Sequence, residues 1–450
     1  MTQIPVINSR SNVGLLNVLR TFVRKHPVLF PEKSPEYITC PELGAMIGRI
    51  LAIVFFLGGH ASIAEDGAPT YRTDENDDPS LSWYQLVDGE FPPEGSAHYI
   101  SGELVDIDHL ERELVLRVDR SDDQTAGMKD RTIDATMLPY GSVYSNGQPA
   151  TLRDLPIGTH LHGWFYERPE GEEKVWTMKH GKLTSSVGQR VSNEVDFTRC
   201  LRLEDDFSYR ARQNQIWKVD AVDLEANELK AILHQGGKPV GDAQTFELRT
   251  STEVYQEKGF GSLTDIQPGQ EVLMNLTWAT LYNSGRVLQI WLDVESRKLA
   301  SSRQLERHRN HVRDRGIPGW VDAVDDKKNL VTITFFEGVD PKLFEDFDII
   351  VPEPLGWPTS GGAKDDLKPK GTIAVARDCL MTYEPVNDRK GGNILKVASV
   401  PKLPGSSGLQ IQVQCGMLLE GYRPGGIVRF YPASWKVVSL PLEERYFGRE

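Results

Sequence analysis

Short runs of alternating hydrophobic and polar residues recur along most of the chain and predict β-strands. Three such runs read ELVLRVD, ELKAILH and NLVTITFF. Period-two alternation is typical of strands with one buried face. A short polar stretch, such as DLEANE, precedes each run and has the composition of a hairpin turn. The pattern therefore predicts repeated β-hairpins.

The hairpins belong to an internal repeat. VDAVD occupies Val219–Asp223 and Val321–Asp325, and a looser copy, LVDID, occupies Leu104–Asp108. A second motif, Leu-x-Asp-Leu/Ile-x-x-Gly, follows at Leu152–Gly158 and at Leu263–Gly269. Its glycine supplies the positive φ of a tight turn that directs the chain into a closing hairpin. We expect a mainly β fold, with tandem small β-barrel modules of the OB or SH3-like kind joined by α-helical linkers.

The third copy of the glycine motif is less regular. DDLKPKG, which ends at Gly371, is assigned to the third module, and LEGYRPG, which ends at Gly425, is assigned to a partial fourth copy. The predicted barrel modules are 98–185, 214–295 and 316–402. The predicted helical linkers are 186–213 and 296–315, and a partial β module covers 403–450.

Both linkers carry apolar residues among their charges, among them Leu201 in the first and Leu299, Leu305 and Val312 in the second. A flexible tether is usually rich in Gly, Ser or Pro instead. We therefore expect both helices to pack on the adjacent barrels and to fix the angle between modules. The second linker is basic: it either binds an anionic partner or pairs with acidic barrels of this chain.

The motifs at Gly102–Asp106 and Leu152–Gly158, with their internal copies, resemble those of uncharacterised secreted bacterial proteins built from repeated small β-barrel domains. Those proteins carry a G-x-V-x-x-V-D strand followed by L-x-D-L-x-x-G. The resemblance implies the fold and an exported protein. It implies no catalytic residues.

An export signal is the strongest local feature near the start of the chain. Arg49 precedes the apolar run Ile50–Leu57, and Ser62 and Ala64 stand at the small positions ahead of a cleavage point. This is the pattern of a secretory signal peptide, predicted over 46–64. Two alternatives stay open: a buried core helix, and a membrane anchor, through which an uncleaved segment contacts the membrane.

The segments on either side of the predicted signal peptide complete the domain prediction. We expect residues 1–45 to be a mis-assigned upstream extension and 65–97 to be an extended acidic leader. We expect the mature protein to be bacterial and exported, as a periplasmic, cell-surface or extracellular protein with an unknown envelope or extracellular partner.

Composition limits the classes of partner. Hydrophobic residues make up 39% and charged residues 26% of 450 residues, as in a globular protein. The net charge of −13 argues against a nucleic-acid partner, because such binding relies on cations facing phosphates. The four cysteines, Cys40, Cys200, Cys379 and Cys415, include no CxxC pair. A bridge between Cys379 and Cys415 stays an open possibility.

The candidate site lies in THLHGWFYERPEGEEKVWTMKHG. Alternation along a strand places His160 and His162 on one face, and His180 lies on the second strand of the predicted hairpin. His-x-His with a third histidine suits zinc or copper. The alternative is a purely structural position. The corresponding residues of the second copy are Glu271 and Leu273, and those counted from Gly371 in the third are Ile373 and Val375.

Other acidic patterns favour structural roles. The pairs Asp220/Asp223 and Asp322/Asp325 recur at equivalent positions, which favours turn or strand-end roles. The DENDDP segment has Asp74 where a calcium loop would start, but it lacks the glycine and glutamate that an EF-hand needs, so we expect a solvated leader.

Two classes of function remain. The first is an exported, non-catalytic binding or scaffold protein of the cell envelope. The second is a metal-dependent enzyme or a metal-binding protein that uses the first module. No nucleophile-elbow, Walker or HExxH motif is present to favour an enzyme.

Overall fold

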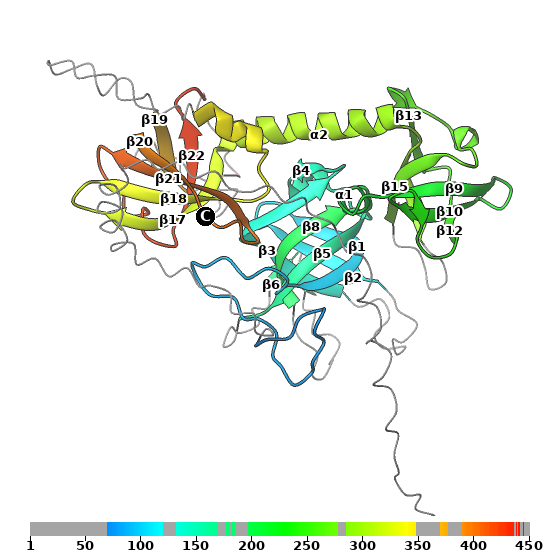
Figure 1. Cartoon of the computed structure of the whole chain (residues 1–450), viewed down its shortest axis with the longest axis horizontal. Helices are drawn as coiled ribbons and strands as arrows, with labels where there is room; N and C mark the ends of the chain where they lie inside the picture. Colours follow the sequence, from blue (N-terminus) through cyan, green and yellow to red (C-terminus); the bar gives the residue numbers. More distant parts are fainter. Residues whose placement is uncertain are drawn as a thin grey trace, which may run out of the picture. The chain divides into compact units, whose positions relative to one another are not determined.

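Three small closed β-barrels follow one another along the chain (Figure 1), which confirms the prediction of a mainly β fold. The architecture comes from a computed structural model that describes residues 70–119, 132–169, 177–179, 182–184, 197–277, 285–347, 370–376, 389–435, 438, 440–441 and 444. Residues from Ala68 onward form one compact unit. The predicted extension 1–45 and signal peptide 46–64 lie outside the described residues. Of the helices in the described part, none has the length and apolar character needed to cross a membrane.

The first barrel closes with a strand that the sequence did not reveal. In the sheet order β2-β1-β5-β8-β3-β4, an additional β2–β3 pairing closes the ring, and β8 runs parallel to β3. The prediction of a helical linker over 186–213 is wrong for 197–205, which is β8, while 186–196 lies outside the described residues. A separate pair comprises β6 (Thr177–Lys179) and β7 (Lys182–Thr184). The barrel strands are β1 (His98–Asp108), β2 (Glu113–Val118), β3 (Thr132–Ser145), β4 (Gln148–Ala150), β5 (His160–Glu167) and β8 (Phe197–Asp205).

The second barrel has the same plan with shorter strands. Strand β12 pairs with both β10 and β16 and so closes the ring β10-β9-β15-β16. Buried Trp217, Val272 and Ile290 form part of its core. Its strands are β9 (Gln215–Asp223), β10 (Glu228–Gln235), β11 (Lys238–Pro239), β12 (Gln244–Glu247), β13 (Glu253–Gln256), β14 (Gly259–Phe260), β15 (Glu271–Thr277) and β16 (Arg286–Trp291).

The third barrel uses the residues that were assigned to a partial fourth module. Its closed order is β17-β18-β21-β20-β19-β22, so the two strands within 403–450 complete this barrel. The separate C-terminal module was therefore a wrong prediction. The strands are β17 (Ile317–Asp325), β18 (Leu330–Phe336), β19 (Lys370–Val375), β20 (Arg389–Ser399), β21 (Ser406–Cys415) and β22 (Ile427–Pro432).

The last aspartate of each VDAVD-type motif caps its hairpin turn, as predicted. Its side chain accepts hydrogen bonds from the backbone N–H groups two and three residues ahead. This holds at Asp108, Asp223 and Asp325. The first aspartates of the second and third copies, Asp220 and Asp322, sit at the matching β-bulge of their strands. Both aspartates of the motif therefore shape the hairpin.

The turn glycine joins the start of each closing strand to the same bulge. The N–H of Gly158 donates to the carbonyl of Leu104, and Gly269 donates to Val219 in the same way, with φ of 92° and 87°. In the third barrel the equivalent donor is Gly425, which bonds to Val321. The assignment of Gly371 to this role is therefore wrong, and LEGYRPG is the third copy.

The leader is not a solvated acidic segment over its described part, from residue 70 to 97. Trp83 is 8% exposed, and Phe91 lies 4.1 Å from the ring of Trp320 in the third barrel. Asp74, at the start of the calcium-like pattern, accepts from the backbone N–H of Tyr99 and lies 2.5 Å from His98 Nδ1. Aromatic packing thus ties this segment to the first and third barrels.

Two α-helices connect the barrels. The short α1 (Asp206–Arg212) leads from β8 to the second barrel. The long α2 (Val294–Arg315) confirms the helix predicted over 296–315, and Asp293 and Gly316 cap its ends. Helix α2 also contacts the first barrel, because Ser301 Oγ donates to the carbonyl of Asn146 at 2.7 Å.

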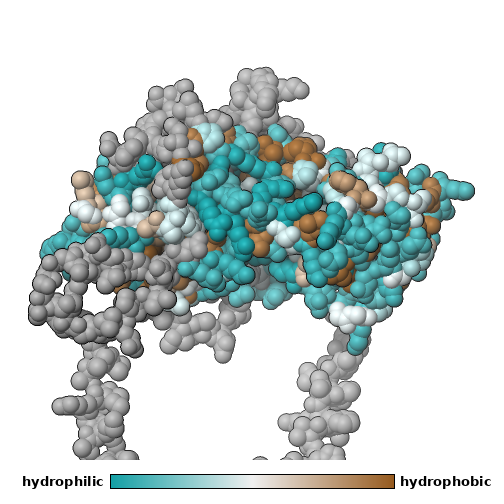
Figure 2. Space-filling model, turned by 90° about the horizontal axis from the view of Figure 1, so that it is seen from above, coloured by the Kyte–Doolittle hydropathy of each residue, from teal (hydrophilic) through white to brown (hydrophobic). Residues whose placement is uncertain are grey.

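The buried side of α2 is mostly polar. Of its predicted apolar contacts, Val312 is buried, whereas Leu299 and Leu305 are only half-buried. Of the two alternatives for the basic residues of this helix, the structure shows pairing with acidic residues of the same chain. The pairs are Arg307–Asp154, Arg309–Asp340 and Arg315–Glu444. Figure 2 shows a mainly hydrophilic face on which hydrophobic residues form separate groups.

Candidate functional site

Two of the three predicted histidines come together at the start of β5. Residues in β5 alternate between faces, so His160 and His162 share one side, and their ring centroids lie 5.0 Å apart. Both are buried, at 9% and 3% exposed. His180 lies outside the described residues.

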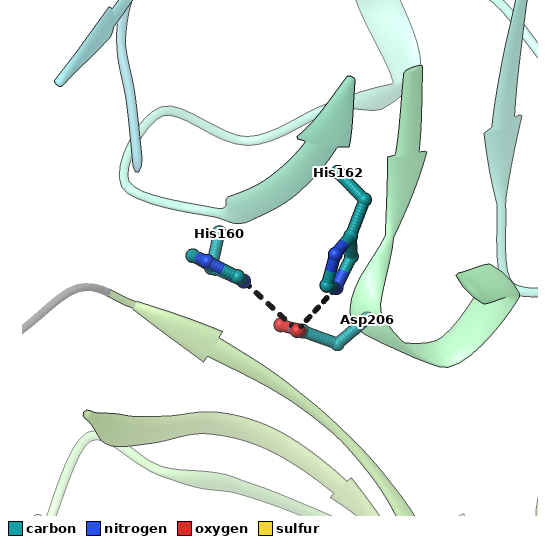
Figure 3. A group of neighbouring side chains, drawn as sticks. All are labelled: His160, His162 and Asp206. Atoms are coloured by element: carbon teal, nitrogen blue, oxygen red, sulfur yellow. Dashed lines mark hydrogen bonds and ion pairs between the residues drawn. The ribbon is translucent and has the colours of Figure 1, made fainter. Parts of the chain in front are cut away.

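The third member of the group is Asp206, which the sequence did not identify. It is the first residue of α1, and Asp205 caps that helix by accepting from Ser208 N at 2.8 Å. The turn from β8 into α1 aims Asp206 at the histidines. Its Oδ1 lies 2.9 Å from His160 Nδ1 and 3.1 Å from His162 Nε2 (Figure 3).

The far nitrogen of each imidazole also has a partner. His160 Nε2 lies 2.8 Å from Asp119 Oδ2, which also accepts from the Ser101 hydroxyl at 2.6 Å. His162 Nδ1 lies 2.6 Å from the Tyr99 hydroxyl. Both rings are therefore held by hydrogen bonds on each side.

An aromatic ring restricts His162 further. The ring of Tyr209, on α1, stacks on His162 at 3.7 Å with an interplanar angle of 10°. Tyr99 and Trp164 also contact each other, 5.6 Å apart. The stacking leaves His162 little freedom to turn away from Asp206.

The second oxygen of Asp206 reaches the second barrel. Asp206 Oδ2 accepts from the backbone N–H of Leu276 at 2.8 Å. The register of β15 shifts between Asn275 and Leu276, where this donor lies. Asn275 also donates to Asp205 Oδ2 at 3.1 Å and accepts from the N–H of Phe207 at 2.9 Å. The histidine site thus adjoins a polar joint between two barrels.

The charges in the metal-free site follow from these contacts. Burial alone would lower the pKa of His160, but the carboxylates of Asp206 and Asp119 outweigh burial and raise it to about 10. Burial opposes ionisation of Asp206, but His160 beside it holds the pKa of that carboxyl well below its ordinary value. Burial lowers the pKa of His162. At neutral pH, a cationic His160 therefore lies between two carboxylates, beside a neutral His162.

The same arrangement suits a transition-metal ion. One ligand atom from each of His160, His162 and Asp206 lies within 4.8 Å of the others. Zinc binds such N and O ligands, and a metal-bound histidine commonly donates its other N–H to a carboxylate or another acceptor. Asp119 and Tyr99 stand at those outer positions. A divalent cation would replace the positive charge that His160 otherwise carries.

The repeats show that this chemistry belongs to the first barrel. The equivalent positions in the second barrel are Glu271 and Leu273. In the third barrel, counted from the turn glycine Gly425, the equivalent positions are Ile427 and Arg429. The predicted equivalents, Ile373 and Val375, were counted from Gly371 and are wrong. Among these three pairs of equivalent positions, only the pair in the first barrel consists of histidines.

Sequence reasoning missed both carboxylates of the site. Asp119 ends the described part of the β1–β2 hairpin, and Asp206 lies in the segment predicted as a helical linker. A helix-cap pattern, Asp205 ahead of DFSYRAR, was the one available indication that a turn lies here. Cys200 and Cys415 are buried in the first and third barrel cores, and Cys379 lies outside the described residues.

Comparisons with known proteins add little. No family model matches the chain, and no curated protein matches it. Among solved structures, it is similar to a 1.0 Å structure of a CusF variant with Cu(II) from Escherichia coli. The identity is 14%, over 18% of this chain and 89% of that one, with a TM-score of 0.13. A similarity this weak supports no inference about this chain.

Proposed function

We propose that this chain is a non-catalytic metal-binding protein of the bacterial cell envelope, and that its first barrel holds one zinc or copper ion. The observation that carries the proposal is the convergence of His160 Nδ1, His162 Nε2 and Asp206 Oδ1, each ring fixed from its far side. Such outer contacts orient metal ligands and set which nitrogen is free to bind.

Burial supports binding rather than catalysis. The side chains of His162 and Asp206 are each 4% exposed, and that of His160 is 11% exposed. A catalytic metal needs an open position that a substrate can reach. Asp119, which bonds to His160 from its far side, is 30% exposed and gives the group one partly exposed member.

The location in the envelope rests on the sequence alone. The proposed signal peptide over 46–64 would direct the chain across the inner membrane. Fractionation of the native host tests this part: protein in the periplasm or medium supports export, and protein confined to the cytoplasm contradicts it.

A second candidate function is that of a metal-free scaffold. It is favoured by the bond from Leu276 N to Asp206 Oδ2, which makes the same carboxylate part of the joint between two barrels. In this case the cationic His160 supplies the positive charge that a metal ion would otherwise supply. The group is then a closed hydrogen-bonded network that holds the barrels at a fixed angle.

Metal analysis separates the two candidates. Purified protein is incubated with zinc or Cu(II), freed of loose metal on a desalting column and analysed by mass spectrometry of its elements. The proposal expects close to one ion per chain, lost in the H160Q/H162Q double variant. H98Q is the matched control, because His98 also pairs with an aspartate, Asp74, but has no second histidine there. Wild-type protein that retains no metal while folded would favour the scaffold.

A further inference from the structure

A second site lies beside the polar joint, in a cleft of about 420 Å³ that is lined by the first barrel, the second barrel and α2 but by neither histidine. Its walls come from the turn after β3, the β13–β14 hairpin and one side of α2. The volume falls within the range of about 300–1,000 Å³ that is typical of small-molecule sites. From its lining we propose that the cleft binds an uncharged carbohydrate of one or two hexose rings.

One wall of the cleft is aromatic. Tyr255 stacks on Trp291 with ring centroids 5.3 Å apart and an interplanar angle of 11°, and Phe260 lies 5.3 Å from Tyr255. Phe260, at the end of a tight hairpin, is 79% exposed, the largest exposed fraction among the large hydrophobic residues described. The faces of aromatic rings carry partial negative charge and attract the weakly positive C–H groups of a sugar ring. An exposed ring beside a cleft is thus suited to stacking on a sugar.

The lining of the cleft also includes polar atoms with no described partner. Asn146 Oδ1 and Thr159 Oγ1 are buried, and neither makes a hydrogen bond within the described structure. Thr159 is 1% exposed. Buried polar atoms in native proteins are almost always paired, with protein, water or a ligand. A hydroxyl group donates to Asn146 Oδ1 and either donates to or accepts from Thr159 Oγ1, so a polyhydroxylated ligand satisfies both after a small shift of the wall.

The charges of the lining favour an uncharged ligand. Asp154 pairs with Arg307, so neither presents a net charge to the cleft. Arg303 makes no hydrogen bond or ion pair within the described residues and offers donors to sugar oxygens. The remaining charged residues offset one another: the acids Asp205 and Glu257, and the base Lys258 together with Arg303.

Calorimetric titration of the full-length protein with chitobiose, cellobiose and maltose tests the proposal. We expect saturable binding of at least one disaccharide, weakened about fivefold or more in F260A, since stacking on one ring is typically worth about 1 kcal/mol. Phe260 is exposed, so its loss leaves the barrels folded. The matched control is M417A, which removes an exposed hydrophobic side chain, 55% exposed, from the third barrel.

Two outcomes would overturn the proposal. The first is that none of the three disaccharides binds at concentrations of several millimolar. The second is that a nucleoside monophosphate binds in their place, which would make the cleft an anion site. The H160Q/H162Q variant separates this proposal from the metal site. Neither His160 nor His162 lines the cleft, so carbohydrate binding should persist in that variant.

Discussion

Replacing Asp205 with alanine tests the joint between the first two barrels. Asp205 is 1% exposed and accepts from four groups: Ser208 N, Ser145 Oγ, Asn146 N and Asn275 Nδ2. Loss of the helix cap costs about 1 kcal/mol, and each buried donor left unpaired costs about 1–3 kcal/mol. Burial raises the pKa of Asp205, so removing the carboxylate returns part of its desolvation cost. We expect a net loss of about 3 kcal/mol in the free energy of unfolding.

Urea unfolding followed by tryptophan fluorescence measures this loss. D205N keeps a capping oxygen and should lose about 1 kcal/mol. D265A is the control, because Asp265 also accepts a backbone N–H, that of Ser262, but does so at a 3₁₀ turn of the second barrel, where it is only half-buried. A double-mutant cycle with N275A should show coupling between the two residues. A loss for D205A no larger than that for D265A would refute the joint.

Three further predictions follow from other parts of the molecule. Burial lowers the pKa of His308 to about 4, below its value in the unfolded chain. The free energy of unfolding should therefore be highest above pH 6.5 and fall by about 3 kcal/mol as the pH drops toward 4. In thermal melts across that range, H308Q should make stability less dependent on pH. G269A should cost about 1–2 kcal/mol, because φ is 87° there and the space is open, whereas G259A should cost less than about 0.5 kcal/mol; equal losses would contradict this. F91A should cost about 2 kcal/mol and change the fluorescence of Trp320, and an unchanged spectrum would show that the leader is not held there.

The repeated hairpins were predictable because their cause is local. Alternation, a capping aspartate and a positive-φ glycine each act within a few residues, and each recurs in all three barrels. Strand β8 was not predictable in the same way. It pairs with β3 and β5, which are distant in sequence. Its buried residues Cys200, Leu201 and Leu203 show no clear period-two alternation, and the charged residues around them suggested a helix instead.

The third barrel shows a different limit. A long insertion separates β18 from β19, so the glycine nearest the expected distance, Gly371, was taken for the turn that Gly425 makes. In the candidate site, spacing alone placed His160 and His162 on one face. Asp206 joins them through the folding of β8 and α1 against β5, a contact between residues 44 or more positions apart that no local pattern encodes.

Anomalous diffraction from crystals grown with zinc tests the central claim most directly. We expect one strong peak bonded to His160 Nδ1, His162 Nε2 and Asp206 Oδ1, at about 2.0–2.2 Å from each. Asp119 should still accept from His160 Nε2, since that contact is an outer one. A map with no peak at this position, with both histidines still hydrogen-bonded to Asp206, would contradict the metal site.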